Sequence, residues 1–295
     1  MKNISIGLLF SMLWASASVA TKFGVLSVEP LVLANIRFFI ASVLLLGAAY
    51  LVRPDASYRL PQGVEWRQLA LFAFLNTTLY LGLFVFSMKF AAAGLGSLAT
   101  CTNPLMIILL SAWWIGRKPS KQELLGVLLG MTGVGIATYP LLEGSTTSLT
   151  GIVLLSLSML AISAASVYYA TVRWQLPTML INGWQIALGG LLLLPFTLTM
   201  SDFSQSHWDA RFWWSVLWLS IPVSVVSLLC WFYLLQADTV RASMWLFLCP
   251  LFGFFFAWWL LDEPITGYTL AGTVLVVGGL TLARPGKSTL STGRK

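Results

Sequence analysis

Arg37 is the residue whose type and position most clearly suggest chemistry. It is the one strongly basic residue set well inside a long apolar run, seven positions after Pro30. At ~1.5 Å per helical residue, its charge lies roughly 10 Å below the nearer surface of a bilayer. A charge at that depth is costly and by default indicates function. Two interpretations remain open: contact with a substrate carboxylate, or a structural anchor that snorkels outward or pairs with Glu29 or a helix end.

Two prolines, Pro104 and Pro250, lie near the middle of two apolar runs. A proline inside a helix removes one backbone hydrogen bond and clashes with the carbonyl four residues earlier. In hydrocarbon a freed carbonyl needs a partner or a water-filled cavity. The pair predicts a small polar cavity, able to hold an ammonium group by carbonyl dipoles; the alternative is that both prolines only bend their helices. The residues expected to add polarity or aromatic walls are Trp14, Thr100, Thr102, Asn103, Ser243, Trp245 and Cys249.

A carboxylate pair, Asp262-Glu263, follows one of the last apolar runs. Glu263 is a candidate proton acceptor or gate, and the alternative is a helix cap or a solvated loop carboxylate. The other reactive types form no recognisable arrangement. His207 stands alone, and Cys101, Cys230 and Cys249 contain no C-x-x-C pair, so we expect neither a zinc site nor a disulfide framework. With no phosphate-binding glycine loop either, we expect no enzyme, cofactor or metal.

The composition indicates an integral membrane protein. Of the 295 residues 58% are hydrophobic and 9% are charged, and the mean hydropathy is +0.85. Soluble domains carry about 25% charged residues. This chain has too few charges to cover the surface of a soluble globule of its size. The composition therefore excludes a disordered chain, a disulfide-stapled secreted domain and a cytosolic enzyme.

Ten apolar segments are long enough to cross a bilayer, which takes about 20 residues in a helix. Their apolar runs are continuous rather than alternating with polar residues, so an all-α protein is predicted and a membrane barrel is not. The segments span residues 4–21, 31–52, 66–88, 94–115, 123–140, 149–171, 178–200, 212–236, 240–261 and 268–284.

The basic residues predict the orientation. With ten spans, 13 of the 16 Lys and Arg residues outside the spans fall on the side of the two termini, and three fall on the other side: Lys22, Lys89 and Arg211. The positive-inside rule then places both termini in the cytoplasm. The net charge of +7 is explained by topology, so no nucleic-acid partner is expected. The predicted location is the cytoplasmic (inner) membrane, with the lipid bilayer as partner.

The two halves of the chain are related by an internal repeat. Pro30 and Asn35 recur 147 positions later as Pro177 and Asn182, and the pair Trp113-Trp114 recurs 145 positions later. The repeat predicts two five-helix units, residues 1–143 and 144–295. Because five is odd, the second unit enters the membrane from the opposite side. Inverted repeats are a recurring architecture of secondary transporters, with the substrate site near the midplane between the halves.

The chain resembles the EamA-type members of the drug/metabolite transporter superfamily over essentially its full length. The resemblance lies in Trp14 and Lys22, in Pro30 with the run 37–41, in Cys249-Pro250, in the run 261–266, and in Gly272 and Gly278. It implies ten helices in two inverted repeats and export of small metabolites such as amino acids, their derivatives or drugs, driven by protons. Aromatic amino acid exporters are similar in build.

The sequence departs from that family at one position of the first repeat. A Glu is common shortly after the fourth helix, but residues 115–119 carry Arg117 and Lys118 there, and Asp262-Glu263 exists only in the second half. Two function classes follow. One is a secondary transporter that exports a small organic solute by alternating access. The alternative is a non-transporting membrane bundle, receptor-like or a subunit of a complex.

Overall fold

The computed structural model describes residues 2–52, 58–100, 102–114, 116, 119–143, 147–237 and 245–282. Within these ranges every regular element is a helix. The expected all-α membrane class is confirmed, because seven of the described helices are long and apolar enough to cross a bilayer. The bent pair Ala93–Thr100 and Leu105–Trp114, with 42° between its parts, would add one more span. Two shorter apolar helices follow, and the count of ten spans stays a prediction.

The two halves of the chain contain the same order of elements. Each begins with two long helices, continues with a helix whose middle is π-helical, then an interrupted helix, and ends with one further helix. In the first half these are α1 (Lys2–Val25), α2 (Pro30–Val52), α3 (Val64–Ala73) with η1 (Phe74–Leu81) and α4 (Gly82–Ser87), α5 (Ala93–Thr100) with α6 (Asn103–Trp114), and α7 (Lys121–Glu143). In the second they are α8 (Leu149–Thr171), α9 (Thr178–Met200), α10 (Ala210–Trp218) with η3 (Leu219–Ser227) and α11 (Leu228–Ala237), η4 (Trp245–Leu248) with α13 (Cys249–Leu261), and α14 (Gly267–Leu282).

Local sequence signals set several helix ends. Pro30 opens α2, where its missing N–H costs nothing. The Ser148 hydroxyl accepts a hydrogen bond from the Gly151 N–H at the start of α8. Asp209 caps α10 by accepting from the Phe212 N–H, and this bond lowers the pKa of the Asp209 carboxyl. The single turn η2 (Phe203–Gln205) lies in the connection before α10.

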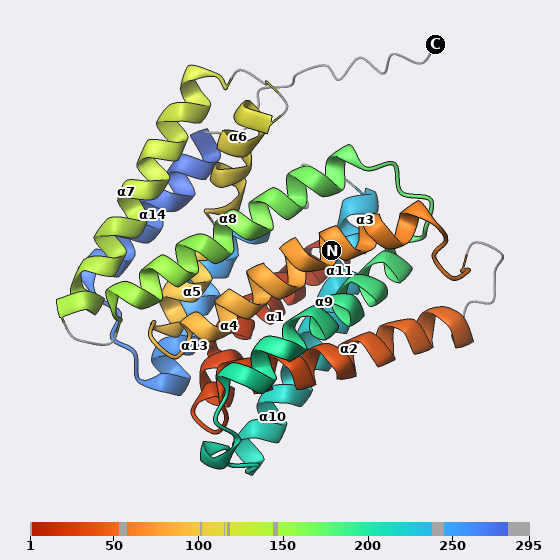
Figure 1. The fold of residues 1–295 in the computed structure, drawn as a ribbon. Helices are drawn as coiled ribbons and strands as arrows, with labels where there is room; N and C mark the ends of the chain where they lie inside the picture. Colours follow the sequence, from red (N-terminus) through yellow and green to blue (C-terminus); the bar gives the residue numbers. More distant parts are fainter. Residues whose placement is uncertain are drawn as a thin grey trace.

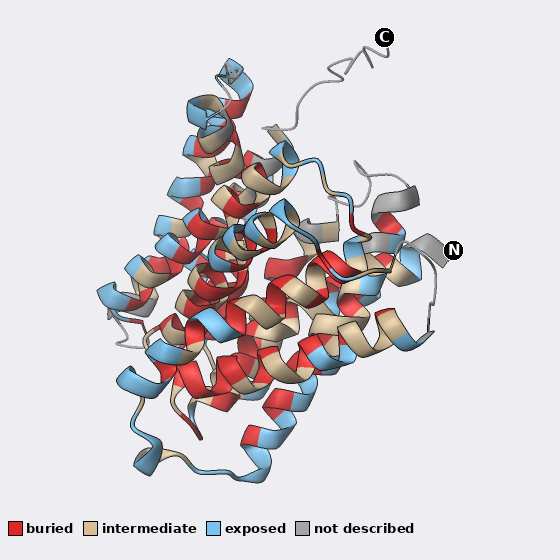
Figure 2. Ribbon diagram, turned by 45° about the vertical axis from the view of Figure 1, so that its right-hand side comes forward, coloured by how far each residue is buried: buried red, intermediate tan, exposed pale blue. Residues whose placement is uncertain are grey.

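Helix α1 runs through the middle of the bundle. It contacts α5 and α13 on one side and α10, η3 and α11 on another, while α2 packs along α9 and α7 packs along α14 (Figure 1). We call the end of the bundle where α1 begins the proximal end, and the end where α1 meets α2 the distal end. Buried residues line the inward faces of the helices and exposed residues the outer faces (Figure 2). Exposed apolar side chains such as Leu128, Val153 and Trp214 suit contact with lipid.

Glycines bring α7 and α14 into backbone contact. A Cβ added at Gly133 would lie 2.6 Å from the Gly272 carbonyl oxygen, and one at Gly272 would lie 2.4 Å from the Gly133 oxygen. Small residues at helix crossings are a main source of helix association in membranes, because they let the backbones approach. The two glycines therefore fix the distance between these helices.

We expect Gly133→Ala and Gly272→Ala to lower the melting temperature of the purified protein by on the order of 5 °C, because the added methyl groups must push the helices apart. Gly135→Ala and Gly278→Ala are matched controls, since nothing lies within 4 Å of a Cβ at either position. The measurement is thermal unfolding in detergent. Equal melting temperatures for the four variants would contradict the close approach.

Candidate functional site

A cavity of about 970 Å³ lies inside the bundle. Tyr58, Pro177 and Thr178, which lie at the proximal end, are among its lining residues, so the cavity reaches that end. Its walls are mostly aromatic and apolar, with a few amides and hydroxyls. The aromatic walls are Phe10, Trp14, Tyr58, Phe72, Tyr80, Tyr169, Trp231 and Tyr233, and the polar groups include Asn76, Thr100, Asn103, Ser166 and Asn182.

A second cavity, of about 130 Å³, adjoins the first and contains the charge. The two share Trp14, Asn76, Tyr80 and Thr100 among their lining residues, so they lie side by side, and we call the two cavities together the path. The smaller cavity is also lined by Arg37. The path therefore runs from the proximal end to a buried guanidinium.

The π-helical segments place side chains on this smaller cavity. η1 contributes Asn76 and Tyr80, and η3 contributes Val223 and Ser224. A π-helical turn inserts an extra residue and rotates the side chains that follow it, and such turns occur often at functional sites. The two segments occupy matching places in the two halves, yet only η1 brings an amide and a phenol to the cavity.

A buried hydrogen-bond cluster holds η1 against α9. The Gln185 Oε1 accepts hydrogen bonds from Asn76 Nδ2 at 3.1 Å and from Thr77 Oγ1 at 2.6 Å. One turn further, Thr78 Oγ1 donates to the Gly189 carbonyl oxygen at 3.0 Å. Asn76 and Gln185 both line the smaller cavity, so this wall is fixed in position as well as polar.

Arg37 is buried, with 6% of its surface exposed, and its Nε atom has no hydrogen-bond partner among the described residues. The guanidinium carbon lies 5.7 Å from the centre of the Phe38 ring. The predicted structural partner, Glu29, instead forms an ion pair with Lys89, at 3.0 Å. Within the structural interpretation, pairing of Arg37 with Glu29 is therefore wrong, and an outward-snorkelling head does not fit a guanidinium that lines an internal cavity.

The two prolines begin helices rather than interrupting them. Pro104 is the second residue of α6 and Pro250 the second of α13. The expectation of a mid-helix proline is corrected at both positions, because a proline in a first turn has no intrahelical bond to lose. Before Pro104 the chain bends by 42° between α5 and α6, and before Pro250 the turn η4 changes directly into the α-helix α13. Thr100 and Asn103, on either side of the first break, do line the larger cavity.

Of the remaining predicted site residues, some line the cavities, some pack elsewhere in the bundle, and some lie outside the described residues. Trp14 lines both cavities. Trp245 packs instead against Phe10 and Leu234, and its ring lies beside Gly7. Pro250 is buried at the start of α13. Ser243 lies outside the described residues, as does Cys101, and the same holds for the side chain of Pro104.

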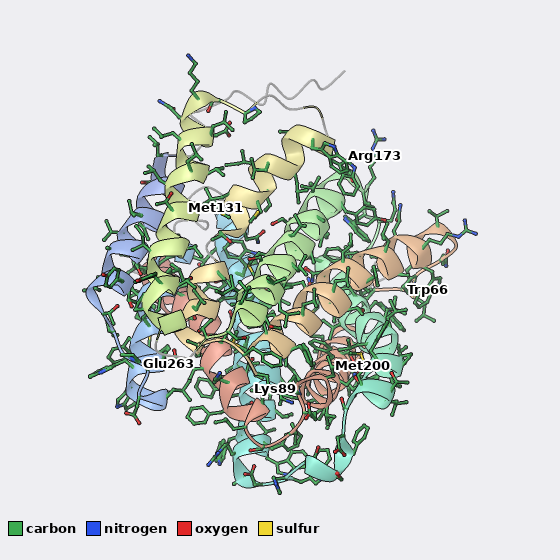
Figure 3. The ribbon with its side chains drawn as sticks, turned by 60° about the vertical axis from the view of Figure 1, so that its left-hand side comes forward. Trp66, Lys89, Met131, Arg173, Met200 and Glu263 are labelled. Carbon is green, nitrogen blue, oxygen red and sulfur yellow. The ribbon has the colours of Figure 1, made fainter. Side chains whose placement is uncertain are left out.

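Glu263 lies at the distal end, where connections between helices meet (Figure 3). Its Oε1 accepts a hydrogen bond from the Ala93 N–H at 2.7 Å and its Oε2 one from the Gly94 N–H at 3.0 Å. A carboxylate is favoured there, because the first N–H groups of α5 lack partners within the helix. The Glu263 carboxylate thus ties the connection after α13 to the start of α5.

Two lysines make further contacts between the connections at the distal end. Lys22 Nζ donates to the carbonyl oxygens of Met88 at 2.8 Å and Ala91 at 2.7 Å, which ties α1 to the connection before α5. Lys89 pairs with Glu29 in the connection between α1 and α2. We call Lys22, Glu29, Lys89 and Glu263 the distal cluster. Arg173 and Trp66 mark the opposite, proximal end (Figure 3).

Among the lining residues that were not predicted as part of the site are Asn76, Tyr80, Asn182 and Gln185. The signal was present for three of them, since an amide inside an apolar run must find a partner or face a polar cavity. In the described part of the chain, no three His, Cys, Asp or Glu side chains gather into a possible metal site.

A helical membrane bundle with a polar and aromatic cavity that reaches one end, and with tied connections at the other, has the build of a membrane transporter. The chain belongs to the EamA-like transporter family, whose model matches residues 1–139 and again 149–284. The predicted family is therefore confirmed. Its members are transporters and not enzymes.

Named relatives agree with this family, and a solved structure shares the fold. The chain is 24% identical over 283 residues to "Uncharacterized transporter YoaV" of Bacillus subtilis, covering 95% of this chain and 96% of the relative. It is 25% identical over 292 residues to "Probable amino-acid metabolite efflux pump" of Salmonella typhimurium, covering 95% and 93%. One crystal structure matches with a TM-score of 0.65 at 20% identity over 96% of each chain, which supports the fold alone.

Proposed function

We propose that this protein is a secondary transporter of the cytoplasmic membrane that exports a small organic solute by alternating access. The carrying observation is the pair of adjoining cavities that leads from the proximal end to Arg37, together with the tied connections at the distal end. A path that reaches one end of the bundle is what one state of such a cycle requires. The printed name of the Salmonella relative favours an amino-acid metabolite as cargo.

The proposed architecture is ten spans in two inverted five-helix repeats, residues 1–143 and 144–295. The matching order of elements in the two halves supports it, including the π-helical segments η1 and η3 and the new α-helices that begin one residue before Pro104 and Pro250. The two matches of the family model also support it. In such a protein each half can adopt the conformation of the other, which exchanges inward-open and outward-open states of similar energy.

We expect both termini to be cytoplasmic, because most of the basic residues outside the spans fall on their side. A reporter active only in the cytoplasm should be active when fused after Lys295. A reporter active only in the periplasm should be active when fused near Glu143. The reverse pair of activities would contradict the ten-span topology. It would also contradict a cytoplasmic location of the proximal end, which is the end where α1 begins.

A proton gradient is the proposed energy source, with Glu263 as the residue on which the proton acts. Protonation would remove the negative charge that holds the N–H groups of Ala93 and Gly94. The distal cluster would thus act as a gate, and its contacts would weaken when a proton arrives from outside. In this proposal Glu263 controls the opening of the distal end, and the solute binds in the cavity.

Proteoliposome flux tests the transport function. The purified protein should move labelled L-phenylalanine, N-acetyl-L-phenylalanine or ethidium faster than empty liposomes do. Thr100→Trp should reduce that flux at least about tenfold, because Thr100 lines both cavities and the indole fills the path between them. Leu198→Trp is the control, since Leu198 is 61% exposed on α9. No flux of any solute would favour the alternative, a non-transporting bundle.

A further inference from the structure

The described side chains that line the path include a single charged group. Arg37 is the one charged side chain among the described residues that line either cavity. The acidic residues whose side chains the structure describes lie instead at helix ends and in connections: Glu29, Glu65, Glu123, Asp202, Asp209, Asp262 and Glu263. The described walls of the path therefore offer a positive charge and no negative one.

Arg37 has no anionic partner among the described residues. The two ion pairs found there join Arg59 to Glu65 and Lys89 to Glu29. A guanidinium stays charged at any physiological pH. A buried charge normally has a partner, because its lost hydration must be replaced. Arg37 lines the smaller cavity, so its partner is best supplied from that cavity.

The surroundings of Arg37 suit a carboxylate. The planar guanidinium fork matches a carboxylate with two parallel hydrogen bonds. The oxygen of Gln185 already accepts two hydrogen bonds, so the group that it has left to offer is its NH₂ donor. The Tyr80 hydroxyl is a further donor on the same wall. The smaller cavity, at about 130 Å³, is several times the ~30 Å³ of one water and accommodates a carboxylate.

The larger cavity suits the rest of such a solute. Trp14 belongs to both cavities, and Phe10 packs on Trp14 and stacks on Trp231 with ring centres 4.9 Å apart. Aromatic walls of this kind favour a flat or apolar body. An ammonium group has a poor place here, because no described carboxylate faces it and Arg37 repels it. The predicted ammonium site depended on carbonyls freed by mid-helix prolines, whereas Pro104 and Pro250 lie in the first turns of α6 and α13.

We propose that the cargo is an organic anion: a carboxylate joined to an aromatic or apolar body, without a free ammonium group. N-acylated and deaminated aromatic amino acids have this chemistry, whereas free amino acids and cationic drugs do not. This inference rests on the proposed transport function and names its substrate class. It assigns the carboxylate to Arg37 and the apolar body to the walls around Trp14.

Four probes of similar body test this assignment: N-acetyl-L-phenylalanine, 3-phenylpropionate, L-phenylalanine and phenethylamine. Their binding to the full chain in nanodiscs is measured by quenching of tryptophan fluorescence, since Trp14 and Trp231 line the path. We expect the first two to bind at least tenfold more tightly than the last two. In Arg37→Gln the preference should fall below twofold, in Arg37→Lys it should survive in part, and in Arg211→Gln, whose arginine is exposed at the start of α10, it should be unchanged.

Several results would overturn the anion site: equal binding of L-phenylalanine, a preference that survives in Arg37→Gln, or no binding of any probe to the parent protein. The ranking in the parent does not depend on how well the variants fold. Counterflow in proteoliposomes separates this inference from the transport function. Binding in the expected order without exchange supports the anion site and contradicts transport, whereas exchange without preference for the two anions supports transport and overturns the anion site.

Discussion

Arg37→Ala is expected to reduce solute export at least about 100-fold. The buried guanidinium is the one charged group on the described walls of the path, and a hydrogen-bonded charged contact contributes about 3 kcal/mol, which corresponds to roughly two powers of ten. Arg37→Lys should recover a part of the activity, because the charge remains and the planar fork is lost. The measurement is initial flux in proteoliposomes at equal protein density.

The same experiment separates a substrate contact from a structural role. If Arg37 acts on the solute, the alanine variant should reach the membrane in amounts close to the parent and melt at a similar temperature. Removal of a buried charge without an anionic partner leaves no partner behind, so no loss of stability is expected. Normal export by Arg37→Ala would refute the contact, and collapse of protein levels would make the residue structural.

Much of the architecture could be predicted from the sequence because hydrocarbon imposes simple rules. Long apolar runs must be helical there, so the membrane class and most helix positions follow from counting. The separation between the third and fourth predicted spans, placed around Lys89, lies between the end of α4 and the start of α5. What counting missed is the shape inside a run. The π-helical segments η1 and η3 read as uninterrupted apolar helix, because their extra residue depends on packing between helices.

The site was only partly predictable, for a related reason. Arg37, Trp14, Thr100 and Asn103 could be identified because their residue types or a nearby proline set them apart, and the structure places all four on the path. The repeat was a weaker guide to individual residues. Asn35 and Asn182 match in sequence, yet Asn35 is buried between α2 and α9, where it donates to Thr197, while Asn182 lines the path. Sequence symmetry does not tell which copy faces the cavity.

Glu263→Gln is expected to open the distal end. The parent carboxylate accepts two backbone hydrogen bonds, from Ala93 and Gly94, whereas an amide presents one acceptor oxygen and an NH₂ group that cannot accept the second bond. Loss of the charge-assisted contact costs about 2 kcal/mol, or roughly 30-fold in the balance between closed and open states. The change mimics protonation, so it also reports what a proton would do at this carboxylate.

Accessibility of the path from each side measures this opening. Thr100→Cys, in a background with the three native cysteines changed to alanine, places a thiol on both cavities. In the parent a membrane-impermeant thiol reagent should reach it from the proximal side alone. With Glu263→Gln the rate of reaction from the distal side should rise roughly 10- to 30-fold, as expected from the weakened contact.

The neighbouring carboxylate provides the control. Asp262 is exposed and its backbone is left-handed, with φ 54°, a conformation that asparagine tolerates, so Asp262→Asn removes a charge at the same place without straining the chain. That variant should leave the distal rate unchanged. Lys22 donates to the carbonyl oxygens of Met88 and Ala91 at the same end of the bundle. Lys22→Met should therefore raise the rate of thiol reaction from the distal side, as Glu263→Gln does. Glu263→Gln could instead behave like Asp262→Asn while Lys22→Met opens the path. In that case Lys22 keeps the distal end closed, and Glu263 is not the residue on which the proton acts.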